Sequence, residues 1–228
     1  MVARVSRKRI AAARRTEVIG DAVLYLGDCM KILPTLGGVD AVVTAPPYGL
    51  NFAAWDSAPP PDAFFDLIRE KAPTAAVHAP AGAIWDWPQP DWVMAWFMPG
   101  SVNRTKGGKF RHWEPILVYG EERAKVDSRV FPPIGGERCG HPCPKPDAIT
   151  RWLVEEFADE GQTILDPFMG SGTTGVACLR LGRKFVGIEI HEPYFDIACR
   201  RIDGEYRRGD FMRQSRPKSR QTDLIGRK

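Results

Sequence analysis

The chain has 228 residues and a formal net charge of +4 at pH 7. This length suits one α/β domain with a real core and leaves no room for a second large domain. No run of about eighteen apolar residues occurs, and the first residues lack a hydrophobic signal segment, so we expect a cytoplasmic protein without a membrane partner. The five cysteines form an odd, scattered set, in agreement with a reducing compartment.

The positive charge gathers at the two ends of the chain. Residues 1–15 contain six Lys or Arg and no acid, and residues 200–228 contain ten Lys or Arg against four acids. Such segments either neutralise phosphates without reading bases or serve as disordered solubilising tails. We expect a basic arm at 1–20, a single domain at 21–203 and a basic tail at 204–228.

Two short apolar strands are expected in the first fifty residues. The first, from Ala22 to Leu26, leads to Asp28, which can cap a helix from about Met30 to Leu36. The second, from Ala41 to Thr44, runs directly into the sequence Ala45-Pro46-Pro47-Tyr48-Gly49. Proline fixes its own φ and favours extended backbone before it, so the carbonyls of this segment have a preset direction while Tyr48 projects as an aromatic face. Carbonyl acceptors beside a ring suit an amino-bearing base.

A tryptophan-rich region follows, with strands expected at about Val93 to Met98 and Glu114 to Tyr119. Most of its tryptophans are expected in the core or at an interface. A glycine-rich basic loop at 103–111 suits a duplex groove, and the candidate DNA-binding residues are Arg104, Lys106, Lys109, Arg111 and Trp113. The segment from Glu121 to Arg138 is an alternative reader of bases, so a small target-recognition insertion is expected within about 100–140.

The next motif is His141-Pro142-Cys143-Pro144-Lys145-Pro146, which leads into a helix expected from Asp147 to Phe157. Cys139, His141 and Cys143 alternate, but zinc sites usually add a second Cys or His pair, and none stands nearby. We therefore expect no metal. Lys145 is either a ligand or a solvated surface lysine.

Residues 163–190 predict a strand, a glycine loop, a helix and a second strand. Gly170 and Gly172 allow close approach of the backbone to a ligand and φ values closed to other residues. Glu189 lies nineteen residues after Gly170, where a carboxylate accepts hydrogen bonds from both hydroxyls of a ribose. Thr173 and Thr174 stand where a phosphate loop has lysine, so a nucleoside without phosphates fits best. The alternative is a tight turn in an ordinary βαβ unit.

The Pro-Pro-Tyr segment resembles the signature of the DNA amino-methyltransferases, which move a methyl group from S-adenosylmethionine to N6 of adenine or N4 of cytosine. The resemblance covers nearly all of residues 20–203, and Pro-Pro-Tyr precedes the glycine loop, which is the permuted, beta-type motif order of this family. It implies an α/β fold: a single Rossmann-like S-adenosylmethionine-dependent methyltransferase domain with a doubly wound, mostly parallel sheet.

The resemblance also assigns roles in binding S-adenosylmethionine. It implies that Asp28 reaches the adenine amino group, that Lys145 faces the cofactor carboxylate and that Phe168 lines the cofactor side. The full set of candidate cofactor-binding residues is Asp28, Lys145, Asp166, Phe168, Gly170, Ser171, Gly172, Thr173, Thr174 and Glu189.

The catalytic segment by the same resemblance is Ala45, Pro46, Pro47 and Tyr48. In this family an acidic or polar residue before the prolines accepts a hydrogen bond from the exocyclic amine, and a proline carbonyl accepts the second. Ala45 accepts none, and loss of one such transition-state contact commonly costs about 100-fold or more in rate. Tyr48 is expected to provide the aromatic face for a base flipped out of the duplex.

Ala45 leaves two classes of function open. The first is an impaired DNA methyltransferase, with adenine N6 preferred over cytosine N4, acting on double-stranded DNA as a homodimer at a short site, as in restriction-modification systems. The second is a module that binds cofactor and DNA without catalysis. The intact cofactor elements favour the enzyme, because a pure binding module would not require them.

Overall fold

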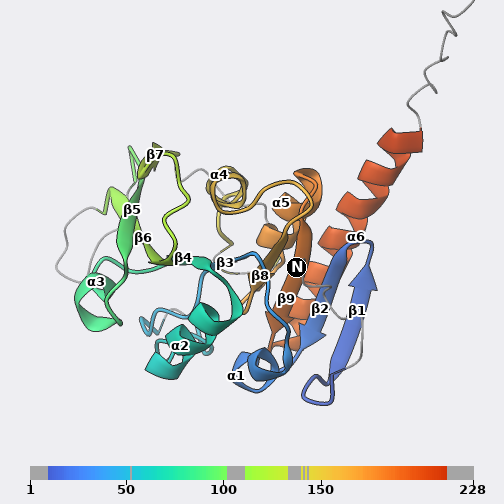
Figure 1. Ribbon diagram of the computed structural model, residues 1–228, viewed down its shortest axis with the longest axis horizontal. Coiled ribbons are helices and arrows are strands. Elements are labelled where there is room, and N and C mark those ends of the chain that lie inside the picture. Colours follow the sequence, from blue (N-terminus) through green and yellow to red (C-terminus); the bar gives the residue numbers. More distant parts are fainter. Residues whose placement is uncertain are drawn as a thin grey trace, which may run out of the picture.

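The computed structural model describes residues 10–51, 53–101, 111–132, 140, 142 and 144–214. Within these residues, the strands form one nine-stranded sheet in the order β1-β2-β9-β8-β3-β4-β6-β5-β7 (Figure 1). The strands are β1 (Arg15–Ile19), β2 (Ala22–Leu26), β3 (Ala41–Thr44), β4 (Thr74–His78), β5 (Trp92–Phe97), β6 (Trp113–Gly120), β7 (Ser128–Val130), β8 (Thr163–Asp166) and β9 (Lys184–Glu189). The helices are α1 (Cys29–Ile32), the 3₁₀ turn η1 (Leu33–Thr35), α2 (Asp62–Lys71), α3 (Ala83–Asp86), α4 (Asp147–Phe157), α5 (Thr173–Arg180) and α6 (Glu192–Gln214).

The centre of the sheet is parallel. β2, β9, β8, β3 and β4 pair side by side in the same direction, whereas β1, β6 and β5 add antiparallel pairs at the two sides. Because parallel strands end at one edge, the residues that follow β2, β3, β8 and β9 meet there. The expected doubly wound, mostly parallel α/β fold is confirmed.

Helices cover both faces of this sheet. β2 shows how the sequence arranges this, because Ala22, Leu24 and Leu26 pack in one core cluster with α4, α5 and α6, while Val23 and Tyr25 pack in another with α1, α2 and α3. Successive side chains of a strand point to opposite faces, so a strand buried on both sides is apolar throughout. Figure 1 shows the two helical layers on either side of the sheet.

The ends of the expected domain differ from the observed elements. β1 begins at Arg15 and pairs with β2, so residues 15–19 of the expected arm belong to the sheet. α6 continues to Gln214, so residues 204–214 of the expected tail belong to a helix. Its residues Phe195, Ala198 and Ile202 recur at helical spacing and are fully buried against the sheet. Among the described residues, no helix combines the length and apolarity needed to cross a membrane.

Candidate active site

The carboxyl edge of the parallel strands gathers the predicted cofactor motifs. Leu26 of β2 lies opposite Glu189 of β9, and Asp166 of β8 lies opposite Gly187 of β9. Asp28 follows β2 by two residues. This register brings three carboxylates, separated by up to 161 residues in the chain, to one edge of the sheet.

A pocket of about 200 Å³ opens at this edge. Its walls come from the ends of β2, β8 and β9, from the proline segment after β3, and from the loop before α2. The lining residues are Gly27, Asp28, Cys29, Met30, Pro47, Ala58, Pro59, Pro60, Pro61, Pro167, Phe168, Glu189 and Ile190. The pocket therefore combines two carboxylates with an apolar wall of ring and proline carbons.

Glu189 is held by the glycine loop. Its Oε2 accepts a hydrogen bond from the Gly170 amide at 2.9 Å, and its Oε1 accepts one from the His191 amide at 2.7 Å. Burial raises the pKa of this carboxyl, which the backbone donors partly oppose. A carboxylate has about four acceptor positions, so each oxygen retains capacity for a further donor. Glu189 can therefore accept two hydroxyl groups from a ligand in the pocket.

Asp28 caps α1 and also lines the pocket. Its Oδ1 accepts a hydrogen bond from the Met30 amide at 2.9 Å and so caps α1. The same side chain lines the pocket and is partly exposed. Capping occupies Oδ1, and the other oxygen, Oδ2, lies 3.9 Å from the Lys31 ammonium.

The glycine loop packs against helix α6. Gly172 has a φ of +81°, and an added Cβ would lie 2.9 Å from the Ala198 Cβ in α6. Arg201, also on α6, donates hydrogen bonds to the Ser171 carbonyl at 2.6 Å and to the Thr173 hydroxyl at 3.2 Å. The loop is thus held against α6 by close packing and by hydrogen bonds from Arg201.

Asp166 links the end of β8 to the end of β3, just before the Pro-Pro-Tyr loop. Its Oδ1 accepts hydrogen bonds from the Thr44 hydroxyl at 2.6 Å and the Phe168 amide at 3.1 Å, and its Oδ2 accepts one from the Thr174 hydroxyl at 2.7 Å. Burial raises the pKa of Asp166 to about 6, although all three donors act to lower it. The end of β3, the end of β8 and the start of α5 are therefore joined through one buried carboxylate.

The Pro-Pro-Tyr loop is fixed by a buried acid further along the chain. Asp56 is 3% exposed, and its carboxylate accepts hydrogen bonds from the backbone amides of Tyr48, Gly49 and Leu50. In return, the Asn51 amide donates to the Asp56 carbonyl at 2.9 Å. The backbone leaving Ala45 is held by prolines and by Asp56, and none of these contacts involves the side chain at position 45.

The Tyr48 side chain ends in a cluster of polar groups. Its hydroxyl donates to Glu114 Oε1 at 2.7 Å, and the Lys145 ammonium donates both to the Tyr48 hydroxyl at 2.7 Å and to Glu114 Oε1. His78, at the end of β4, places its Nδ1 3.6 Å from the same carboxylate oxygen. Burial alone would raise the pKa of Glu114, but Lys145 and His78 outweigh it and hold this pKa below its usual range.

Residues 109–200 match a family model described as a DNA methylase, of the N6/N4 methyltransferase type. This segment carries the His-Pro-x-x-Lys-Pro motif, the glycine loop and Glu189, and the geometry above joins it to the Pro-Pro-Tyr loop.

Less than half of the chain, residues 109–200, is thus similar to the N6/N4 DNA methyltransferase family.

Type II methyltransferase M2.DpnII of Streptococcus pneumoniae is 46% identical over 65 residues, which are 28% of this chain and 24% of that protein. The match thus spans about a quarter of the length of this relative. The crystal structure of the M1.HpyAVI-SAM complex superposes with a TM-score of 0.61 at 24% identity, over 78% of this chain and 98% of that one. PvuII DNA methyltransferase, described as cytosine-N4-specific, superposes with a TM-score of 0.62 at 15% identity, over 84% of this chain and 93% of that one. At these identities, the structures show a shared methyltransferase fold.

The structure brings four of the predicted site residues together at the pocket: Asp28, Pro47, Phe168 and Glu189. The glycine-loop candidates support residues near the pocket. Gly170 donates to Glu189, and Thr174 donates to Asp166. Ser171 and Thr173 contact Arg201. Direct contact of the loop with a cofactor stays a prediction. Lys145 is not among the pocket-lining residues, and its contact with a cofactor carboxylate also stays a prediction.

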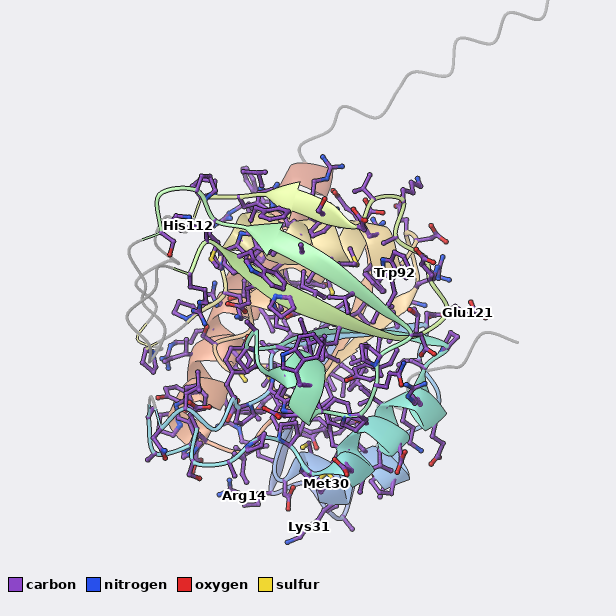
Figure 2. All side chains as sticks on the ribbon, turned by 90° about the vertical axis from the view of Figure 1, so that its left-hand side faces the viewer. Arg14, Met30, Lys31, Trp92, His112 and Glu121 are labelled. Carbon is purple, nitrogen blue, oxygen red and sulfur yellow. The ribbon has the colours of Figure 1, made fainter. Side chains whose placement is uncertain are left out.

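Of the DNA-binding candidates, Arg104, Lys106 and Lys109 lie outside the described residues. Arg111 places its Nη2 3.9 Å from Glu114 Oε2, and Trp113 begins β6 with a partly exposed ring. Figure 2 faces the β5–β7 end of the sheet and shows His112, next to Arg111, at one end of these strands and Trp92 and Glu121 at the other. Cys139, His141 and Cys143, for which no metal was expected, also lie outside the described residues. Among the described residues, no potential metal-ligand cluster occurs.

Sequence reasoning missed several residues that shape the site. No motif considered above contains these residues, which are Asp56, the prolines at 59–61, Glu114 and Arg201. One signal was available for Glu114, since the sequence Trp-Glu-Pro-Ile-Leu-Val-Tyr sets a glutamate at the start of an apolar strand, and charges in such strands are buried only with partners.

Proposed function

We propose that the chain is a DNA amino-methyltransferase that transfers a methyl group from S-adenosylmethionine to the exocyclic amine of a flipped base, with adenine N6 preferred and cytosine N4 as the alternative. The observation that carries this proposal is the position of Pro47, which belongs to the target motif and also lines the pocket formed by Asp28, Phe168 and Glu189. Cofactor and target base would therefore meet at a common wall.

The pocket residues suit S-adenosylmethionine. Glu189 offers acceptors for two ribose hydroxyls, Asp28 offers one for an adenine amino group, and Phe168 adds an aromatic ring. When bound, the cofactor supplies a methyl group on a sulfonium, which is already an activated donor. The contribution of the protein is to align and polarise the amine.

The target side contributes an aromatic face and backbone acceptors. An amine inside a duplex cannot reach a cofactor pocket, so the base must be extruded at a cost of a few kcal/mol, and Tyr48 would stack on it. A carbonyl of Pro46 or Pro47 would accept one amine hydrogen. With Ala45, the second hydrogen lacks its acceptor, so we expect a rate lower by about 100-fold or more than that of an acidic variant.

The test compares the chain with Ala45→Asp and Ala45→Ser. Labelled methyl transfer to mixed-sequence double-stranded DNA is measured for each, and the product nucleosides are then separated. We expect N6-methyladenine from Ala45→Asp at about 100-fold or more the rate of the unaltered chain. N4-methylcytosine as the main product, strongest in Ala45→Ser, would replace adenine by cytosine as the target.

The second candidate function is a module that binds cofactor and DNA without catalysis, and Ala45 itself favours it. Absence of product from all three forms, alongside measurable binding of cofactor and DNA, would overturn the enzyme and support the module. In either case we propose double-stranded DNA as the partner and a homodimer as the assembly, which light scattering of the free protein and of its DNA complex checks.

A further inference from the structure

We propose that Glu114 is a positioning residue for the target base: by anchoring the hydroxyl of Tyr48 together with the Lys145 ammonium, it holds the Tyr48 ring in the orientation that receives the flipped base. This inference rests on the proposed function, and it adds a residue that no motif of the sequence indicated.

The contacts converge on one carboxylate oxygen. Glu114 Oε1 accepts from the Tyr48 hydroxyl at 2.7 Å and from the Lys145 ammonium, which also donates to the Tyr48 hydroxyl at 2.7 Å. The same ammonium lies 5.0 Å from the centroid of the Tyr48 ring. Glu114, Tyr48 and Lys145 thus form a closed triangle of charge-assisted hydrogen bonds, which are stronger than neutral ones.

The three residues come from three separate parts of the fold. Tyr48 follows β3, Glu114 is the second residue of β6, and Lys145 precedes α4. Glu114 is only 3% exposed, so its carboxylate is shielded from water and its charge is stabilised by these partners. A buried ion pair replaced by apolar residues is often no less stable, so a gain in stability alone does not explain the triangle.

The residues around the triangle connect it to the predicted DNA-contacting loop. His78 is 3% exposed, and its Nδ1 has no hydrogen-bond partner among the described residues, although it faces Glu114 Oε1 at 3.6 Å. Burial and the Lys145 ammonium lower the pKa of His78. Arg111, at the end of the basic loop, lies 3.9 Å from the other oxygen of Glu114. Glu114 therefore stands between the predicted DNA-contacting loop and the predicted base platform.

Both ends of Tyr48 are then fixed. Asp56 accepts from its backbone amide, and Glu114 accepts from its hydroxyl. A side chain already held in its working orientation loses less freedom when a ligand arrives, so binding and alignment of the base improve. Loss of the anchor should therefore slow methyl transfer while leaving the cofactor pocket intact, because neither Glu114 nor Tyr48 lines that pocket.

A double-mutant cycle tests this coupling. Tyr48→Phe, Glu114→Gln and the double variant are made in the Ala45→Asp form, and single-turnover transfer to mixed-sequence duplex is measured with the dissociation constant for S-adenosylmethionine. We expect each single variant to lose about tenfold in rate and the double variant to lose little more, because both remove the same contact. The dissociation constant for the cofactor should change less than about twofold, since the pocket keeps its residues.

Matched controls separate the anchor from general damage. Tyr119→Phe removes a buried hydroxyl that donates to the Pro88 carbonyl, and Glu205→Gln removes an ion-paired carboxylate on α6. Neither should alter the rate or couple to Tyr48→Phe. Additive losses in the Glu114 cycle would overturn the inference and leave Glu114 with a structural role. If Glu114→Gln does not fold, Lys145→Gln with Tyr48→Phe gives a second cycle through the same triangle.

A spectroscopic readout distinguishes failure of this inference from failure of the proposed function. With ring-¹³C tyrosine, the Tyr48 resonance is identified by its disappearance in Tyr48→Phe. We expect Glu114→Gln to shift that resonance alone among the tyrosines, and an unshifted resonance would overturn the anchor. If no form transfers methyl groups, the proposed function fails and the catalytic part of the inference fails with it, whereas the resonance still decides whether Glu114 holds the ring.

Discussion

Asp166 is a fully buried carboxylate whose three hydrogen bonds only partly offset its removal from water. Its pKa is raised from 3.8 to about 6, so between these values the folded chain binds a proton that the unfolded chain has released. The contribution of this group to stability is therefore lost as the pH rises from about 4 to about 6.

The prediction concerns Asp166→Asn, which removes the titration. From pH 4 to pH 7, the free energy of unfolding of the unaltered chain should fall by on the order of 3 kcal/mol relative to that of the variant. Urea titrations of both proteins across this range measure it. A difference that stays constant with pH would contradict a raised pKa for Asp166.

Single residues also show what the sequence could and could not predict. Asp28, Phe168 and Glu189 line one pocket because each stands at a fixed offset from an apolar strand, and parallel strands bring such positions to one edge. Asp56 and Glu114 act on the same site from loops and strands whose contacts depend on three-dimensional packing. The role of Asp56 has no local pattern in the chain, and Glu114 showed only the signal of a charge at the start of an apolar strand.

At the scale of elements, the glycine loop and α6 form one unit. Gly172 is the N-cap of α5 with a φ of +81°, and α6 leaves no space for a side chain there. The sequence correctly predicted a φ closed to other residues, but it attributed the missing Cβ to a ligand. The structure adds Ala198 as a second reason, because helix packing lies in tertiary contacts that the motif does not contain.

Gly172→Ala should destabilise the fold by about 2–4 kcal/mol, from backbone strain together with a clash. Gly161→Ala is the matched control, since Gly161 has a φ of +82° and open space around its missing Cβ. That variant carries the strain alone, so it should cost about 1–2 kcal/mol. Thermal and urea unfolding of the two variants separates the cost of backbone strain from the cost of the clash. Equal losses in the free energy of unfolding would show that α6 shifts to accommodate the added methyl group.

Helix and strand boundaries were predicted with different success for a related reason. The helix at Asp147–Phe157 was predicted with its observed bounds, because Pro146 precedes it and its apolar residues recur at helical spacing. The helix expected from Met30 to Leu36 is instead a single turn, α1, followed by the 3₁₀ turn at Leu33–Thr35. Pro34 lacks an amide hydrogen, and the chain tightens there rather than continuing as an α-helix.

At the scale of the whole molecule, the prediction concerns how the distribution of charge affects DNA binding. Residues 215–228 contain five Lys or Arg and one acid. If they contact phosphates, removing them should reduce the slope of log K against log salt concentration for duplex binding by about 2–4, because each neutralised phosphate contributes about 0.9. Fluorescence anisotropy with a mixed-sequence duplex at several salt concentrations measures it. An unchanged slope would assign these residues to solubility.

The loop after β3 has a consequence for how this chain relates to an active enzyme. Its backbone is held by two prolines and by Asp56, so the conformation does not depend on which side chain stands at position 45. An alanine codon ending in a pyrimidine becomes an aspartate codon through one change, at its second base. Where the codon for residue 45 ends in a pyrimidine, a single nucleotide separates a chain that lacks the acceptor from one that carries it, with the backbone of the loop already in place for either.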